Sequence, residues 1–417
     1  MIMLCERIIE NHAMIDAVRL RKSAESTVEL LKEDLGISRT TADKICATLL
    51  DESEPIIERK NRKLVLKGEV GYFLGISIGS KHIRVTLLGL DLEPVPKEWI
   101  ETTLGISGLR SVDGLVLNEK ESDDISFAYD TPCEKDFEAL RSAISNLTAL
   151  FLRRAALSGS PCFPLMGIGF AVCGPVDYDA KIWRSSPRMS FVQNITILDL
   201  IGYSNQTLAD ELGIFMSIDN NAKAAIVSEY QYLLETHGGK YDEDVALIYI
   251  GSGVGSATVM NNSLLRGSQN LSGELGHIKI LVDEHPEKTP ATKSIEECLV
   301  PLEEDEDAEK TRARYIRYIP YVLNIINCIL GIDRFILVGH SISQSKDIIP
   351  SIMAERIKFT VSSTQQYCTA EKGRGEASTA AIGAAMEAYY SMCDYDTKRN
   401  DANRINLAHD LTWPSAK

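Results

Sequence analysis

The chain has 417 residues, of which 44% are hydrophobic and 25% charged, so it is long enough to form two or three globular domains. Its formal net charge of -15 argues against a protein whose whole surface binds nucleic acid. No apolar run reaches the roughly 18 residues of a membrane span, and the N-terminus lacks a signal-peptide pattern. The nine cysteines are dispersed. These features predict a cytoplasmic protein with reduced thiols and no membrane partner.

The acidic excess lies outside the N-terminal part of the chain. Residues 1–70 contain 12 Lys or Arg and 13 Asp or Glu, whereas the whole chain contains 44 and 59. The N-terminal part is therefore close to neutral, with a basic cluster at one end, and the larger C-terminal part carries the negative charge.

Residues 1–54 are predicted to be helical because they contain few Gly or Pro. A helix ending in "LLKED" is followed by Gly36, which can adopt the left-handed conformation of a helix C-cap. Ser38 can then cap the N-terminus of a second helix. The apolar face of this second helix is formed by Ala42, Ile45, Leu49 and Leu50.

Two short strands, in "IIER" and "KLVLK", flank the basic turn Lys60-Asn61-Arg62. A helix, a tight turn, a polar second helix and a basic wing, in this order, are typical of a winged helix-turn-helix domain. We therefore expect residues 1–70 to bind operator DNA, as a homodimer or higher homo-oligomer because one module reads few bases. The expected base-facing residues are Ser38, Arg39, Thr40, Thr41 and Lys44, and the expected phosphate-contacting residues are Arg59, Lys60, Arg62 and Lys63.

The alternative for this segment is a set of helices and a hairpin that only pack together. Arg39 and Lys44 are few cations for a helix that reads DNA, so this alternative stays open.

After Glu69 the pattern changes to strands that alternate with helices, which predicts an α/β protein. The hairpin "GYFLGISIGSKHIRVTLLGLD" at 71–91 has two β-rich runs around a Gly-Ser-Lys turn. Further strands and strand–helix units are expected in "LMGIGFAVCGPVD", "LGIFMSIDNNAKAAIVSEY", "DVALIYIGSGVGSATVM" and "RFILVGH", and a closely packed helix in "ASTAAIGAAMEAYYSM".

Three groups suggest chemistry on phosphates and hydroxyls. The "GSGVG" turn at 251–255 can offer backbone N–H groups to a phosphate, although ordinary hairpins also use Gly. Asp219 ends an apolar strand, where it can accept a hydroxyl proton or simply cap the next helix. Glu274 and His277 in "SGELGHI" suit the hydroxyls of a polyol, or serve the structure.

Taken in order, these segments resemble the ROK family of bacterial sugar kinases and sugar-responsive transcriptional repressors, and most of all its repressor branch. The resemblance covers nearly the whole chain. It implies a winged helix-turn-helix domain followed by a two-lobed, actin-like sugar kinase fold. The implied lobes are residues 71–217, completed by a C-terminal helix at about 386–400, and residues 218–385.

The same resemblance implies a sugar-like ligand in the cleft between the lobes, with Asp219 at the position of the catalytic base. The residues implied at the ligand are Asp219, Asn221, Glu274, His277 and Arg188. Those implied in phosphate-loop-like turns are Gly79, Ser80, Gly251, Ser252, Gly253, Gly255 and Gly339.

The chain departs from the kinase pattern of this family at several positions. Ser77 stands where the kinases carry an Asp that helps to place the metal-bound nucleotide phosphates. Arg188 and Ile218 each replace an Asn. No cysteine lies between His277 and Cys298, so the family's Cys₃His zinc site cannot form and no metal is expected.

The sequence therefore predicts a transcriptional regulator that is controlled by a sugar or sugar derivative, has no cofactor and has lost catalysis. Two alternatives remain open. One is an active sugar kinase with an added helical domain, which would need ATP and Mg²⁺ and would use Asp219 as its base. The other is an interaction scaffold whose cleft and winged helix are both silent.

Overall fold

The computed structural model describes residues 2–22, 26–51, 53–132, 136–157, 162–239, 241–282, 291–300, 307–339, 342–343, 345, 347–357, 368–374 and 378–400. The chain divides into two compact units. The first contains the described residues up to Tyr241 together with residues 380–400, and the second is Asp242–Thr379. The described residues of the expected winged helix and first lobe thus share one unit, which also contains those of 218–241 and 380–385 from the expected second lobe. The three-part division at residues 70, 217 and 385 stays a prediction.

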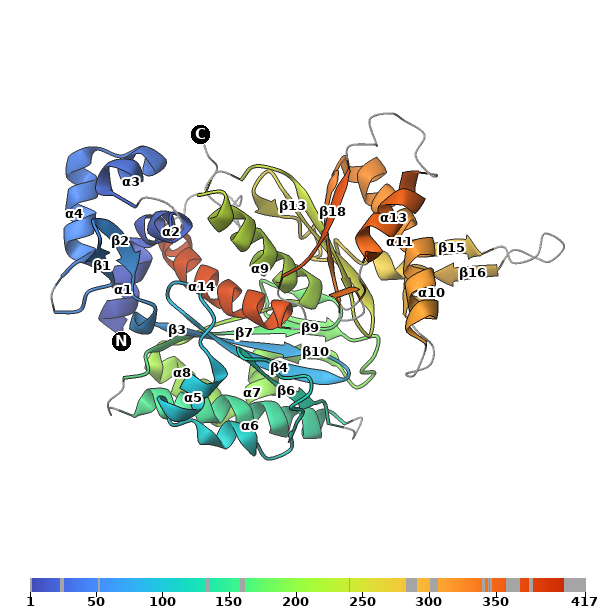
Figure 1. Ribbon diagram of the computed structural model, residues 1–417. Helices are drawn as coiled ribbons and strands as arrows, with labels where there is room; N and C mark the ends of the chain where they lie inside the picture. The colour runs from blue at the N-terminus through green and yellow to red at the C-terminus, as the bar shows by residue number, and fades with distance from the viewer. Residues whose placement is uncertain are drawn as a thin grey trace. The chain divides into compact units, whose positions relative to one another are not determined.

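The N-terminal part of the first unit forms the predicted helix-turn-helix and wing (Figure 1). Gly36 has a φ of 64° and ends the helix before the turn, and the Ser38 hydroxyl accepts the Thr41 N–H at 3.1 Å. The wing turns at Asn61 and Arg62, whose φ angles of 50° and 67° are those of a two-residue hairpin turn. The elements are α1 (Ile2–Glu10), α2 (His12–Leu20), α3 (Val28–Leu35), α4 (Arg39–Leu49), β1 (Ile57–Lys60) and β2 (Lys63–Leu66).

The buried face of α4 differs from the prediction. Cys46 is buried with Ala42 and Leu49, whereas Ile45 and Leu50 are only partly buried. Residues four apart share a helix face, so Cys46 lies on the face of Ala42. Ile45, one residue before Cys46, is turned about 100° away from Cys46 around the helix axis.

The first unit is built on a six-stranded sheet in the order β11-β7-β3-β4-β6-β5. Strands β3 and β4 form the predicted hairpin, and β7 runs parallel to both β3 and β11. Every residue of β3 is buried, as expected for a central strand that is covered on both faces. The strands are β3 (Tyr72–Ile78), β4 (His82–Gly89), β5 (Val116–Leu117), β6 (Ser126–Asp130), β7 (Leu165–Val172) and β11 (Phe215–Asn220).

Helices cover both faces of this sheet (Figure 1). Even-numbered residues of β3 pack with α6 to α8 in one apolar core, and α9 and α14 lie on the other face. The remaining elements are η1 (Gly68–Val70), α5 (Lys97–Thr102), η2 (Ser107–Arg110), α6 (Phe137–Ala156), β8 (Val176–Asp177), β9 (Ile182–Ser185), β10 (Gln193–Thr196), α7 (Ile197–Ile201), α8 (Tyr203–Leu212), α9 (Asn221–Thr236) and α14 (Thr379–Asn400).

Helix α14 packs on the sheet through glycines. A Cβ atom on Gly75 of β3 would lie 1.9 Å from the Ala381 carbonyl oxygen, and one on Gly169 of β7 would lie 1.8 Å from that of Ala384. Such distances are sterically impossible, so only Gly allows this approach. The predicted close packing of this helix is confirmed, and the helix spans Thr379–Asn400.

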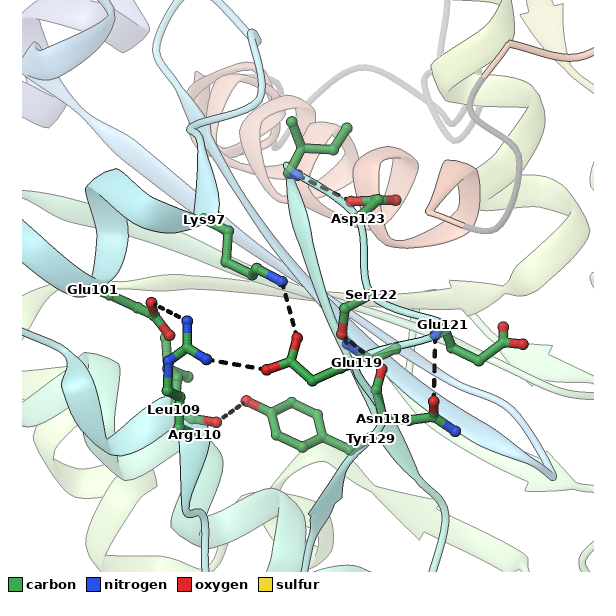
Figure 2. A network of polar contacts seen from close by, with 12 residues as sticks. Lys97, Glu101, Leu109, Arg110, Asn118, Glu119, Glu121, Ser122, Asp123 and Tyr129 are labelled. Atoms are coloured by element: carbon green, nitrogen blue, oxygen red, sulfur yellow. Dashed lines mark hydrogen bonds and ion pairs between the residues drawn. The ribbon is translucent and has the colours of Figure 1, made fainter.

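The outer edge of the same sheet is rich in charge. The Arg110 guanidinium contacts Glu101 at 2.7 Å and Glu119 at 3.0 Å, and Lys97 contacts Glu119 at 3.6 Å (Figure 2). Beneath them the Tyr129 hydroxyl donates to the Leu109 carbonyl at 2.6 Å.

The second unit contains a five-stranded sheet in the order β14-β13-β12-β17-β18, in which β12 and β17 are parallel. Its apolar core joins this sheet to α10, α11 and α13. The elements are β12 (Val245–Ile250), β13 (Val254–Met260), β14 (Ser263–Leu264), η3 (Leu275–His277), β15 (Lys279–Val282), β16 (Ala291–Ser294), α10 (Ile295–Leu299), α11 (Ala308–Leu330), β17 (Arg334–Val338), α13 (Ile348–Ile357) and β18 (Thr369–Lys372).

The predicted α/β class is thus confirmed in both units. None of the helices in the described ranges is long and apolar enough to cross a membrane.

Candidate functional site

The ends of three parallel strands gather polar residues in the first unit. Ser77 of β3 and Asp219 of β11 both pair in register with Ala171 of β7, so they lie in one row across the sheet. Two strand spacings separate them, or roughly 10 Å. Ligands of α/β proteins bind at such carboxyl ends of strands.

Ser77 contacts Asn221, the first residue of α9. The buried Ser77 hydroxyl donates to Asn221 Oδ1 at 3.3 Å, and Asn221 Nδ2 donates to the Cys173 thiol sulfur at 3.3 Å. A hydroxyl, an amide and a thiol therefore meet where β3, β7 and β11 end. We call these three residues the neutral cluster, since none of them carries a charge in its ordinary state.

Asp219 lies at the end of β11, as the sequence indicated. Its side chain is buried, and its Oδ1 accepts the Asn220 N–H at 2.7 Å. That it contacts a bound sugar stays a prediction. The alternative role as the helix cap is wrong, because the Asn220 side chain accepts the Ala222 N–H and caps α9.

The turn of the β3–β4 hairpin uses its own backbone groups. The Gly79 N–H donates to the His82 carbonyl at 2.9 Å, and the Gly79 carbonyl accepts the Thr131 hydroxyl at 2.8 Å. One of the two predicted phosphate-loop residues here, Gly79, therefore has no N–H to offer. Ser80 is half-buried in the same turn, and Arg188 is exposed in the loop after β9.

In the second unit the "GSGVG" turn follows β12 and closes on itself. The Gly251 N–H donates to the Gly253 carbonyl at 2.9 Å, and the Val254 N–H donates to the Glu296 carboxylate at 3.1 Å. A phosphate at this turn would meet the negative charge of Glu296. Ser252 and Gly255 are half-buried beside them.

Gly339 follows β17, the strand next to β12 in the sheet. A Cβ atom there would lie 2.1 Å from the Ile250 carbonyl oxygen, and its φ of 152° is one that only Gly adopts readily. This glycine is therefore required for the close approach of the two strand ends, which is a structural reason for its presence.

Glu274 and His277 lie together in the second unit, as the sequence suggested. Their carboxylate and imidazole are 3.9 Å apart, and the His277 side chain is 57% exposed. The segment that follows forms the β15–β16 hairpin. Among the described residues, no three His, Cys, Asp or Glu side chains are arranged to hold a metal ion. That the protein binds no zinc stays a prediction.

The predicted reading helix α4 has an exposed polar N-terminal half. Ser38, Arg39, Thr40, Thr41 and Lys44 are all exposed. The Arg39 guanidinium contacts Glu29 of α3 at 2.5 Å and Asp43 at 3.0 Å. A base edge would have to replace these carboxylates.

The wing presents three of its four predicted cations to solvent. Arg59, Lys60 and Arg62 are exposed, whereas Lys63 is half-buried and lines a cavity with Arg19 and others. Lys63 is thus the least suited of the four to hold a phosphate.

Sequence reasoning missed the neutral cluster and Glu296. Asn221 was included as a ligand residue, but its contact with Ser77 joins positions 144 residues apart. For Glu296 no local signal exists, because the carboxylate reaches the turn only through the fold of α10 against β13.

The elements and sheets of both units define the class of protein: a sugar kinase fold, built on two sheets and preceded by a winged helix-turn-helix. A solved structure described as a ROK family transcriptional regulator, a homologue of the E. coli MLC protein, superposes with a TM-score of 0.62 at 17% identity, over 92% of this chain and 97% of that chain. A ROK family glucokinase from Streptomyces griseus, in complex with glucose and AMPPNP, superposes with a TM-score of 0.53 at 15% identity, over 77% of this chain and all of that one.

The sequence model of the ROK family matches residues 73–299, which is more than half of the chain, so this chain belongs to the ROK family. The xylose repressor of Bacillus subtilis strain 168 is 24% identical over 266 residues, which are 60% of this chain and 55% of the repressor. The chain thus spans about half the length of the curated repressors that it matches.

Proposed function

We propose that this chain is a sugar-responsive transcriptional repressor. Its winged helix binds operator DNA, and a sugar or sugar derivative bound by the sugar kinase fold changes the affinity for that DNA. Phosphoryl transfer is lost. The family membership and the similarity to xylose repressors support this proposal.

The observation that carries the proposal is the exposed N-terminal half of α4. In a helix-turn-helix this end of the second helix approaches the base edges in the major groove. Thr40, Thr41 and Lys44 are exposed there, and Arg59, Lys60 and Arg62 lie on the wing, where long cations suit backbone phosphates. Two copies of the chain would be needed to read two half-sites.

The neutral cluster supports the loss of catalysis. Transfer of a phosphoryl group needs a residue that accepts the proton of the attacking hydroxyl and charges that hold the metal and nucleotide. Ser77, Asn221 and Cys173 supply neither in their ordinary states, and Asp219 is buried away from solvent. Hydroxyl and amide groups of this kind are suited to hydrogen-bond a sugar without reacting with it.

The first test is selection of genomic fragments by the purified full-length chain, followed by titration of a selected and a scrambled fragment at several salt concentrations. D-xylose and D-glucose are the first effectors to add, because the matched relatives are xylose repressors and glucokinases. A selected fragment whose affinity changes with one of these sugars supports the proposal. Absence of any preferred fragment contradicts it.

Two sets of variants separate base reading from phosphate contact. Arg39→Ala should weaken the selected fragment by roughly tenfold and the scrambled one much less, if Arg39 contacts a base. The double variant Lys60→Ala/Arg62→Ala should weaken binding to both fragments alike. It should also reduce the slope of log affinity against log salt concentration by about one for each lost phosphate contact. Arg141→Ala removes an exposed cation of α6 as the matched control and should change neither.

The kinase alternative is tested in parallel. Coupled assays with Mg-ATP and a panel of common sugars should show turnover well below about 1 s⁻¹, the lower end of typical kinase turnover numbers. Turnover at that rate would show that the neutral cluster does not prevent catalysis.

A further inference from the structure

Arg19 joins the winged helix to the rest of the first unit. It lies on α2, and only 2% of its surface is accessible. Its guanidinium donates to the Leu90 carbonyl, just after β4, at 2.9 Å and forms an ion pair with Asp16. The guanidinium carbon also lies 4.4 Å from the centre of the Tyr389 ring of α14, within the range of a cation–π contact.

Tyr389 continues this contact into the sheet. Its hydroxyl donates to Asp16 Oδ1 at 2.8 Å, and its ring meets Phe73 of β3 edge-on, with centroids 5.5 Å apart and planes at 88°. Phe73 lies four residues before Ser77 on the same strand. One aromatic ring therefore contacts both the winged helix and the strand that carries part of the neutral cluster.

Helix α14 is itself fixed to β3, β7 and α9, the elements next to the neutral cluster. Gly75 and Gly169 of the sheet meet its backbone, and Gly383 packs so closely on α9 that a Cβ atom would lie 1.7 Å from the Ala224 carbonyl oxygen. The Tyr390 hydroxyl donates to Gln231 of α9 at 2.7 Å. Movement of β3 or α9 would therefore displace α14 with them, because close packing without voids transmits displacement.

A second ion pair across this joint is more exposed. Lys22 pairs with Glu93, but both side chains are more than 40% exposed, and such surface pairs contribute little. A cavity lies beside Arg19, lined in part by Lys22, Ser26 and Asp91. Of these two cations, Arg19 is the buried one, so its contacts are the better suited to fix the geometry of the joint.

We propose that Arg19 is the positioning residue of the winged helix. It fixes α2 on α14 and on the end of β4, so that the predicted reading helix α4 follows α14 when the strands next to the neutral cluster move. The part of this statement that concerns DNA rests on the proposed function. The attachment itself does not.

Amide hydrogen exchange on the full chain tests the attachment without DNA. Arg19→Met keeps an unbranched stem up to the position of Nε but loses the charged guanidinium, and Tyr389→Phe loses only the hydroxyl. Arg19→Met should speed exchange in α2, α3 and α4 by about tenfold or more while β3 and β7 stay protected, since local opening is independent of global unfolding. Tyr389→Phe should show a smaller change in the same helices.

Lys22→Met is the matched control, because it removes a cation just after the same helix and at the same joint. It should leave exchange within about twofold of the wild type. Equal acceleration in β3 and β7 would mean that Arg19 only stabilises the unit as a whole, and unchanged exchange in the helices would mean that other contacts hold them. Either outcome overturns the proposal.

The DNA part is tested with the fragment selected by the wild type. Insertion of one to three base pairs between its half-sites should weaken wild-type binding by about tenfold or more, because half-site spacing mirrors a fixed protein geometry. Arg19→Met should lose less than about threefold on the same insertions while keeping its affinity for a single half-site. Equal loss in variant and wild type overturns this part. If the wild type selects no DNA, the proposed function fails, and hydrogen exchange still decides the attachment.

Discussion

The joint around Arg19 and the outer edge of the first sheet both hold segments together through an arginine with acidic partners, but they differ in burial. The Arg19 side chain is 1% exposed, whereas Arg110 and Glu119 are each 56% exposed (Figure 2). At the outer edge, water and salt compete for every charge. At the joint the Arg19 side chain is almost fully removed from solvent, so its contacts with Asp16 and Tyr389 are screened much less. The same residue type therefore sets geometry in one region and only surface charge in the other.

The largest difference should come from removing the buried cation. Arg19→Met leaves Asp16 without its buried ion-pair partner, and loss of one member of a buried pair costs about 3–5 kcal/mol. The cost should fall on the local attachment of the winged helix, and amide hydrogen exchange in α2 measures it. A loss no greater than that of Lys22→Met would show that the burial of Arg19 confers no special strength.

A steric change in the same region should rank second. Gly383→Ala improves helix propensity, yet its Cβ must displace the Ala224 carbonyl of α9. Overpacking of this kind costs about 1–3 kcal/mol. Gly108→Ala is the control, since its Cβ would meet only the flexible end of Leu150, at 3.2 Å. If Gly383→Ala is as stable as Gly108→Ala, the helices can separate at no cost and α14 is not held as described.

A pH-dependent effect should be smaller. Burial raises the pKa of Glu235 on α9, near the Arg19 joint, although its hydrogen bond with Gln231 and the positive charge of Arg19 oppose this. The folded chain therefore holds this proton more tightly than the unfolded chain does. The stability linked to it is full below the ordinary pKa of 4.5 and is lost as the pH rises through the folded pKa.

Glu235→Gln keeps an amide oxygen that accepts from Gln231 but cannot ionise. The variant should therefore gain stability relative to the wild type as the pH rises above 4.5. Denaturation midpoints of both proteins between acid and neutral pH measure the difference. A difference that stays constant, or that shrinks with rising pH, contradicts the raised pKa.

The smallest effect should come from the outer edge. Arg110→Ala removes the contacts with Glu101 and Glu119 (Figure 2), but exposed ion pairs contribute little and are screened by salt. The denaturation midpoint should stay unchanged at low and high salt. A large, salt-independent loss would mean that this network stabilises the edge and that burial does not explain the difference between the two regions.

The elements of both regions were predictable from sequence where the signal is local. The left-handed Gly36, the Ser38 cap and the Asn61-Arg62 turn identify the winged helix, and the apolar runs around Gly75 and "GSGVG" identify the strands. Arg19 was not predictable as a buried residue, because a single cation on an amphipathic helix is normally exposed. Its partner Tyr389 lies far away in the sequence: the hydrogen bond from Tyr389 to Asp16, on the same helix as Arg19, joins positions 373 residues apart.

The candidate site divides in the same way. The sequence indicated which segments approach it but not which contacts they make: after β11, Asn220 caps α9 and Asn221 hydrogen-bonds to Ser77. Three polar residues in a row leave this choice open, because it depends on the strand's pairing with β7 and on the start of α9.

The place of α14 in the chain has a consequence for biosynthesis. The ribosome makes the sheet of the first unit early and the helix that covers one face of it only after the whole second unit, residues 242–379. At about 5–20 residues per second this interval is on the order of ten seconds. During that time Gly75 of β3 and Gly169 of β7 lack the helix that packs on them, and Arg19 has no Tyr389 to contact. A nascent chain interrupted before α14 would therefore hold its winged helix without the contact between Arg19 and Tyr389, through the Leu90 contact and the remaining packing.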